Sequence, residues 1–226
     1  MIRTLADIDV AALAAFDAII DVRSPGEFAE DHLPGAINLP VLDDAERAEV
    51  GTEYVQGSKF RARRNGAALV ARNIARHLEG ALADAPAGLK PLVYCWRGGQ
   101  RSHAMATIMD QVGWPVTVLE GGYRTWRRAV VQRLYDEQMG LQIVLLDGQT
   151  GVGKTEMLGR LAEAGVQVID LEGLANHRGS LFGRMPGGQP SQKLFDSRLM
   201  AVLAGLDPSR AVVVEAESSR VGTVTL

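Results

Sequence analysis

Apolar runs bounded by turn residues dominate the pattern of the first 130 residues. Strands are expected at 17–23, 90–95 and 115–122, with a further short strand closing the turn-rich segment 31–40. Residues 62–80 have the apolar spacing of a helix that stops at Gly80, and residues 102–112 predict another. The apolar positions expected on one face of the first helix are Ala67, Leu69, Val70, Ile74 and Leu78. This alternation predicts an α/β fold in which helices cover both faces of a parallel sheet.

A second alternation begins near residue 141. Strands are expected at 141–148, 166–173 and 210–218, and helices at 154–165 and 190–207. A polar helix at 124–140 joins the two parts, so we place a domain boundary near residue 138. The sequence therefore predicts two α/β domains, residues 1–138 and residues 139–226.

Composition narrows the class of protein. The 226 residues are 46% hydrophobic and 23% charged, which is ordinary for a globular protein. No apolar run reaches the roughly 18 residues of a membrane span, and the N-terminus lacks the pattern of a secretory signal. The single cysteine, Cys95, excludes an internal disulfide. We therefore expect a cytoplasmic protein without a membrane partner.

Charge is unevenly distributed along the chain, although the net charge is only −3. Residues 43–53 are acidic, whereas 59–77 and 123–133 are rich in arginine. Local basic faces can bind the phosphates of a nucleic acid even on an acidic protein. A solvated helix surface explains the same residues equally well.

The only cysteine lies in VYCWRGGQRS, residues 93–102, between a predicted strand and a predicted helix. Backbone N–H groups of such a loop, with the dipole of the following helix, can bind an anion and stabilise a thiolate. Gly98 and Gly99 permit the necessary curl, and Arg97 and Arg101 could hold an oxyanion. A buried structural cysteine is the alternative, but the glycines and arginines favour a nucleophile.

A second anion-binding pattern, GQTGVGKT, follows the apolar run that ends near residue 147. Strand, glycine-rich loop, lysine and helix in this order are typical of a P-loop. Its predicted phosphate-binding residues are Gly148, Gln149, Thr150, Gly151, Val152, Gly153, Lys154 and Thr155. Lys154 would reach the outer phosphate oxygens and Thr155 could ligate Mg²⁺. Whether the loop takes ATP, GTP or another phosphate compound stays open.

Acidic residues follow the strands expected beside the P-loop. Asp170, Glu215 and Glu217 could position a metal or a water there, or could simply be solvated strand ends. The loop 176–183, which contains His177, Arg178 and Ser180, could bind substrate or only turn the chain. We predict no dedicated metal site.

Three segments together resemble rhodanese-type sulfurtransferases. They are DVRSPGEFAEDHLPGAINLP (21–40), VYCWRGGQRS (93–102) and LEGGYRTW (119–126). The resemblance implies that Cys95 carries transferred sulfur, and that Asp21, Arg23 and Glu27 are structural. Five residues separate Cys95 from Arg101, which is longer than small rhodaneses commonly have and similar to dual-specificity phosphatases. A Cys95-dependent phosphatase therefore remains an alternative.

The pairing of a rhodanese-like domain with a P-loop domain resembles the tRNA 2-selenouridine synthases. This resemblance extends over nearly the whole chain and is carried by the segments YCWRGGQRS, GQTGVGKTEML and DLEGLANHRGSLFG. The family replaces the sulfur of wobble 2-thiouridine with selenium from selenophosphate, and it can attach a geranyl group from geranyl diphosphate, which gives the expected intermediate. The family's P-loop domain continues beyond the strands found here, so we expect a C-terminally truncated form.

The resemblance also implies roles for the two loops. Cys95, Arg97, Gly98, Gly99 and Arg101 would bind selenophosphate, with selenium taken up as a perselenide. The P-loop would hold the diphosphate of the geranyl donor.

The same resemblance implies macromolecular partners. The arginine-rich segments would contact the anticodon region of tRNA, and an enzyme that supplies selenophosphate is a candidate partner. Trp96 or Trp126 could stack on a splayed base, although core packing is the more frequent role of a tryptophan. Two alternatives stay open: a phosphatase or sulfurtransferase with a regulatory nucleotide-binding domain, and an ATP-binding regulatory module.

Overall fold

A computed structural model describes residues 1–149, 152–177, 186–215, 220–221 and 224–225. The chain divides into two compact units, Met1–Ala129 and Val130–Leu226. The division falls inside helix α6 (Tyr123–Val131), earlier than the boundary near 138 that the sequence suggests. Helix α6 runs directly into a π-helical turn, η1 (Gln132–Asp136), so the connecting segment is helical on both sides of the division.

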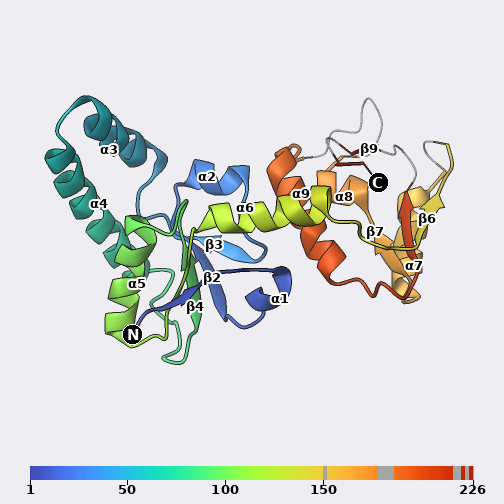
Figure 1. The fold of residues 1–226 in the computed structure, drawn as a ribbon, viewed down its shortest axis with the longest axis horizontal. Helices are drawn as coiled ribbons and strands as arrows, with labels where there is room; N and C mark the ends of the chain where they lie inside the picture. Colours follow the sequence, from blue (N-terminus) through green and yellow to red (C-terminus); the bar gives the residue numbers. More distant parts are fainter. Residues whose placement is uncertain (150–151, 178–185, 216–219, 222–223, 226) are drawn as a thin grey trace. The chain divides into compact units, whose positions relative to one another are not determined.

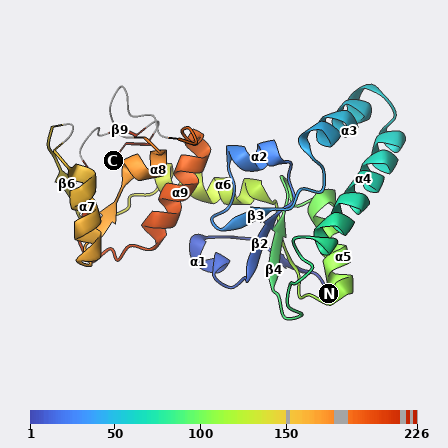
Figure 2. The same cartoon turned by 180° about the vertical axis from the view of Figure 1, so that it is seen from behind.

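Unit 1 is built on a five-stranded parallel sheet in the order β1-β5-β4-β2-β3 (Figures 1 and 2). The strands are β1 (Arg3–Leu5), β2 (Ala18–Asp21), β3 (Ala36–Asn38), β4 (Pro91–Tyr94) and β5 (Thr117–Leu119). β2 and β4, which lie next to each other, are almost entirely buried, because helices cover both faces of the sheet. The parallel α/β architecture predicted from the apolar runs is confirmed.

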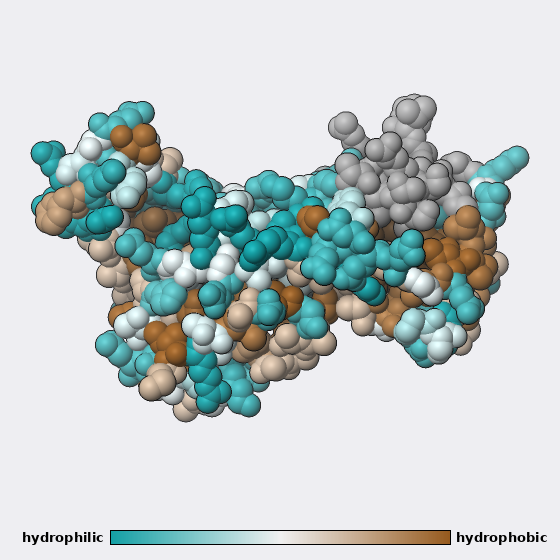
Figure 3. Space-filling view, viewed as in Figure 1, coloured by the Kyte–Doolittle hydropathy of each residue, from teal (hydrophilic) through white to brown (hydrophobic). Residues whose placement is uncertain are grey.

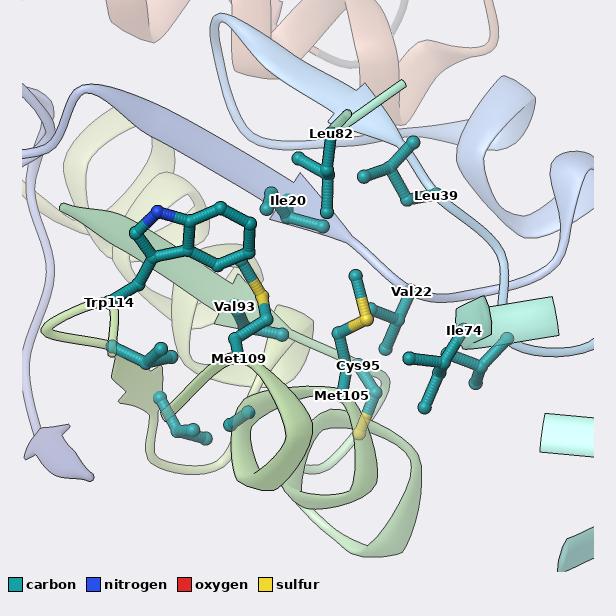
Figure 4. Packing of buried hydrophobic residues seen from close by; sticks show 14 of the residues in the cluster. Ile20, Val22, Leu39, Ile74, Leu82, Val93, Cys95, Met105, Met109 and Trp114 are labelled. Atoms are coloured by element: carbon teal, nitrogen blue, oxygen red, sulfur yellow. The ribbon is translucent and has the colours of Figure 1, made fainter. Parts of the chain in front are cut away.

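Five helices lie within this unit, and a sixth, α6, crosses its C-terminal boundary. They are α1 (Val10–Leu13), α2 (Pro25–Glu30), α3 (Asp44–Gln56), α4 (Lys59–Glu79), α5 (Gln100–Val112) and α6. Figures 1 and 2 show α4 and α5 on one side of the sheet and α1 and α6 on the other. Figure 4 shows the core on the α4–α5 side, where Met105, Met109 and Trp114 pack against Ile20 and Val93 of the central strands.

The paired helices α3 and α4 correct the sequence-based prediction in two ways. Helix α3 was not expected, although Asp43 and Glu46 form a capping box at its start. Helix α4 begins at Lys59, three residues before the predicted start, and ends at Glu79 with Gly80 as its C-cap, as the stop signal indicated. Ile74 is buried, as expected, but Ala67 is exposed.

Unit 2 contains the three-stranded parallel sheet β6-β8-β7 within the described residues. Its strands are β6 (Ile143–Leu146), β7 (Gln167–Ile169) and β8 (Val212–Glu215), and its helices are α7 (Lys154–Glu163), α8 (Leu171–Ala175) and α9 (Gln192–Ala204). A short antiparallel pair follows, β9 (Arg220–Val221) with β10 (Val224–Thr225). The predicted strand at 166–173 is shorter than expected, because Asp170 caps α8.

The edge strand β6 exposes apolar side chains. Ile143 is 42% exposed, Val144 50% and Leu145 60%. Figure 3 shows a hydrophobic patch on unit 2 over the place where Figure 1 labels β6 and α7. In the part of the chain that the structure describes, no helix is both long enough and apolar enough to cross a bilayer.

Candidate functional site

The Cys95 loop, residues 95–102, joins the buried strand β4 to helix α5. Cys95 is only 3% exposed, and its Sγ accepts a hydrogen bond from the N–H of Gly99 at 3.3 Å. The Ser102 hydroxyl lies 3.3 Å from the same sulfur and donates to the carbonyl of Gly99 at 3.1 Å. The sulfur is therefore fixed by its own loop, and only a small group can reach it.

Several of the residues that follow Cys95 in the loop have backbone N–H groups that make no hydrogen bond to the described part of the chain. Within the described residues, no hydrogen-bond acceptor is present for the N–H groups of Arg97, Gly98, Gln100, Arg101 and Ser102. The last three belong to the first turn of α5, where the helix dipole adds positive potential. Such a run of free N–H groups favours a bound anion.

The turn at 119–122 holds the loop in shape. The N–H of Tyr123 donates to the carbonyl of Cys95 at 2.8 Å. Gly98 and Gly122 both have positive φ angles, +65° and +59°. A Cβ on Gly122 would collide with the carbonyl oxygen of Cys95, so only glycine fits there. The close contact explains why the LEGGYRTW segment, with its glycine at position 122, occurs together with the Cys95 loop.

The two arginines of the loop differ in their surroundings. Arg97 is exposed and has no hydrogen bond or ion pair with the described residues. Arg101 instead donates to Glu27 Oε2 at 2.9 Å, and Arg47 reaches the same oxygen at 3.0 Å. Burial would raise the pKa of Glu27, but the Arg101 and Arg47 guanidinium groups outweigh it and lower that pKa. Arg97 is thus the loop's free cation.

The remaining residues of the rhodanese-like signature form a buried support. Arg23 donates to Asp21 Oδ2 at 2.6 Å and to the carbonyl of Asp31 at 2.6 Å. Its guanidinium lies 4.1 Å from the ring centre of Tyr123, whose hydroxyl donates to Asp31 at 2.8 Å. Tyr123 directly follows the turn that holds the Cys95 loop. The Asp21–Arg23 ion pair therefore stabilises the loop through the contact between Arg23 and Tyr123. Asp21 and Arg23 are structural residues here.

The second predicted site lies between β6 and α7. Gly153 has a φ of +86° and precedes α7. Lys154 Nζ donates to the carbonyl of Gly148 at 2.7 Å, which places the ammonium over the loop. Gly148 donates to Asp147, and Val152 donates to the carbonyl of Gln149 at 3.3 Å. Thr150 and Gly151 lie outside the described residues.

Acidic side chains gather near the start of α7. Thr155 Oγ1 lies 3.4 Å from Glu172 Oε2, a residue that sequence reasoning did not single out. Glu215, at the end of β8, is 4% exposed and accepts from the N–H of Glu172 at 2.7 Å, while its second oxygen has no hydrogen bond to any residue that the structure describes. Burial raises the pKa of Glu215. Asp170 instead caps α8 through the N–H of Gly173.

Other predicted residues have different positions. Trp126 is fully buried, so it has the core-packing role expected from the sequence as the more frequent one. Trp96 is half-buried and its ring stacks on that of Tyr123, with 5.2 Å between the ring centres. His177 donates its backbone N–H to the carbonyl of Glu172. Arg178, Ser180 and Glu217 lie outside the described residues. No three histidine, cysteine or acidic side chains of the described chain gather as a metal site.

Comparison with known families assigns both halves of the chain. Residues 6–129 match the rhodanese-like domain, and residues 141–226 match the tRNA 2-selenouridine synthase AAA domain. The two matches include the Cys95 loop and the P-loop. The chain belongs to the tRNA 2-selenouridine synthase family.

Individual relatives agree with this assignment. The tRNA 2-selenouridine synthase of Pseudomonas syringae pv. syringae is 38% identical over 211 residues, which are 91% of this chain and 56% of the relative. That of Nitrosomonas europaea is 36% identical over 223 residues, 96% of this chain and 58% of the relative. The chain therefore spans a little over half the length of these members of the family.

Among solved structures, one similar chain is the N-terminal domain of a candidate ATP/GTP binding protein from Clostridium difficile 630. It is 35% identical, with a TM-score of 0.47, and the match covers 56% of this chain and 99% of that domain.

Proposed function

We propose that the chain carries the two reaction sites of a tRNA 2-selenouridine synthase. The P-loop of unit 2 would transfer a geranyl group from geranyl diphosphate to the sulfur of wobble 2-thiouridine. The Cys95 loop of unit 1 would then replace the geranylated sulfur with selenium from selenophosphate. The observation that carries the proposal is that one chain holds two glycine-rich loops, each between a strand and a helix, one with a thiol and one with a lysine.

The first step needs a site for a leaving diphosphate. The sulfur of 2-thiouridine forms a bond to the first carbon of the geranyl group, and the carbon–oxygen bond to diphosphate breaks. Lys154 and the loop N–H groups would stabilise the departing anion. Where Mg²⁺ takes part, the side chains of Thr155 and Glu172 would hold it against the phosphate oxygens, since Thr155 Oγ1 lies 3.4 Å from Glu172 Oε2.

The second step uses the thiol as a nucleophile toward phosphorus. The Cys95 thiolate would form a sulfur–phosphorus bond as the selenium–phosphorus bond of selenophosphate breaks, which frees hydrogen selenide anion. That selenium attacks C2 of the geranylated base, and the carbon–sulfur bond breaks with release of geranylthiol. Water then hydrolyses the phosphocysteine to phosphate.

This route differs from the perselenide that the resemblance to the tRNA 2-selenouridine synthases implies. Selenium keeps its oxidation state throughout, so no oxidant is needed, whereas a perselenide made from a thiolate and selenophosphate would require one. The five residues between Cys95 and Arg101, together with the free N–H groups, favour a tetrahedral phosphorus group in the loop.

Binding of the tRNA itself is proposed for the exposed arginines of α4. Arg61, Arg63, Arg64, Arg72 and Arg76 are all exposed. A positive helix surface of this kind binds phosphates with an affinity that falls as salt rises. A selenophosphate-supplying enzyme would be a further partner of unit 1.

The test is a reconstituted reaction on an anticodon stem-loop RNA that carries 2-thiouridine. With geranyl diphosphate and selenophosphate, the 226-residue chain should yield 2-selenouridine, detected by nucleoside mass spectrometry. C95S should lower 2-selenouridine formation at least about 100-fold while S-geranyl-2-thiouridine accumulates. Q111A, an exposed site on α5, serves as the matched control.

Two results would contradict this assignment. One is formation of 2-selenouridine by C95S at the wild-type rate. The other is release of phosphate from small phosphoesters, abolished by C95S, with no change in the RNA nucleosides. That second result would establish the phosphatase instead.

A further inference from the structure

A cavity of about 640 Å³ lies in unit 1 between helices α3 and α4 and the start of α5. Figure 1 shows α3 and α4 side by side, with α5 next to α4. The volume falls within the range typical of small-molecule sites, roughly 300–1,000 Å³. Neither the thiol reaction nor the P-loop uses this space. We call it the α3–α4 cavity.

The walls of the α3–α4 cavity are mostly aliphatic. Leu42, Val50, Val55 and Val70 contribute the larger side chains. Gly66 lets α4 approach α3 closely, since a Cβ there would lie 3.1 Å from Val50 Cγ1. Tyr54 is the only aromatic residue of the lining. A nucleobase would need stacking partners and hydrogen-bonding groups along these walls, whereas a branched hydrocarbon chain needs neither.

The cavity shares residues with the Cys95 loop. Gln100 and Arg101 line it, and they are also the first two residues of α5, whose N–H groups belong to the anion site. Arg47 lines it as well, and both arginines pair with the single carboxylate of Glu27. Two guanidinium groups against one carboxylate leave a net positive charge beside the apolar space. The cavity thus suits an apolar chain attached to an anionic molecule.

We propose that the α3–α4 cavity binds the S-linked geranyl group of the alkylated tRNA nucleoside while selenophosphate occupies the Cys95 loop. This inference rests on the proposed function and adds a binding site to it. The hydrocarbon would lie between α3 and α4, its sulfur would face the first turn of α5, and the RNA phosphates would meet the arginines. The geranyl group then acts as an anchor that brings C2 of the base to the selenium donor.

The test compares anticodon stem-loop RNAs that carry S-methyl-, S-prenyl- or S-geranyl-2-thiouridine. Binding to the 226-residue chain is measured by fluorescence anisotropy at fixed salt. Affinity should rise with chain length, and the S-geranyl RNA should bind at least about tenfold more tightly than the S-methyl RNA. Equal affinities for the three RNAs would overturn the proposal.

A matched pair of variants locates the effect. Ala67 lines the cavity, whereas its neighbour Ala68 does not, and both side chains are exposed on α4. A67W should fill the cavity and abolish the preference for the S-geranyl RNA, while A68W should keep it. A wild-type far-UV circular dichroism spectrum and melting temperature in both variants would show that the fold is retained. Persistence of the preference in A67W would contradict the proposal.

Failure of this site and failure of the proposed function give different results. If 2-selenouridine forms but affinity does not depend on the length of the S-alkyl group, the proposed function is supported and binding of the geranyl group in the cavity is rejected. If affinity depends on the length of the S-alkyl group but no 2-selenouridine forms, the cavity proposal is supported and the proposed function is rejected. Binding of geranyl diphosphate alone that is lost in A67W, without preference among the RNAs, would assign the cavity to the donor and overturn our inference.

Discussion

The Cys95 loop and the P-loop are both glycine-rich turns between a strand and a helix, yet they are held differently. The Cys95 loop rests on the turn at 119–122 and, through Tyr123, on the buried pair of Asp21 and Arg23. The P-loop follows β6, an edge strand with exposed apolar side chains, and its lysine bonds to its own loop. The difference fits the proposed roles, since a reactive thiol would need a rigid frame, whereas a loop that binds a diphosphate could complete its shape with the ligand.

The largest effect is expected at the support of the Cys95 loop. G122A places a Cβ against the carbonyl of Cys95 and forces alanine into a left-handed conformation. It should lower the free energy of unfolding of unit 1 by about 3 kcal/mol or more. All three tryptophans lie in unit 1, so the urea dependence of tryptophan fluorescence measures this change directly.

The control for this experiment is G159A, on helix α7 of unit 2. A Cβ there meets no atom within 4 Å, so the fluorescence transition should stay unchanged. Wild-type stability of G122A would show that the turn at 119–122 does not hold the cysteine loop.

The P-loop should respond in the opposite way. If the P-loop binds geranyl diphosphate as proposed, K154A should weaken that binding at least about tenfold, because it removes the ammonium expected to stabilise the outer phosphate oxygens. The free energy of unfolding should change by less than about 0.5 kcal/mol, since the loop is exposed. Isothermal titration calorimetry and urea unfolding check the two halves of the prediction. K90A, an exposed lysine of unit 1, should change neither.

Strands and both loops could be predicted from sequence because their signals are local. An apolar run bounded by turn residues defines β4 or β6, and the spacing of glycines and lysine defines the P-loop. The function of the neighbouring glycines also follows, since positive φ angles at Gly98 and Gly153 are what such turns require.

Three features could not be predicted, and the physical reasons differ. Helix α3 buries none of its residues, so its sequence lacks the apolar stripe that indicates a helix. Its only sequence signal is the capping box. The pairing of Arg101 with Glu27 joins residues 74 positions apart, which no local pattern encodes. The neighbourhood of Glu172 and Thr155 likewise depends on where β7 ends and α8 begins.

The buried carboxylate of Glu215 is expected to lower the stability of unit 2 when it is ionised. Its buried carboxylate has a raised pKa, so its contribution to stability is present below its unfolded value near 4.5 and is lost as pH rises through the folded pKa. E215Q should therefore raise the melting temperature at pH 8, by about 3 °C, with the gain vanishing below pH 4.5. Far-UV circular dichroism across this pH range measures it, and a destabilised variant at pH 8 would contradict the prediction.

The smallest effect is expected at Glu27, which ties Arg101 and Arg47 to the support of the Cys95 loop. The two guanidinium groups lower the pKa of Glu27, so its stabilising contribution is present above the ordinary value near 4.5 and is lost as pH falls through the folded pKa. E27Q should lower the stability of unit 1 by about 1 kcal/mol at pH 7, and the difference from wild type should shrink toward pH 3. Tryptophan fluorescence in urea at both pH values measures the change. A difference that is constant with pH would mean that the charge of Glu27 plays no part in holding the loop.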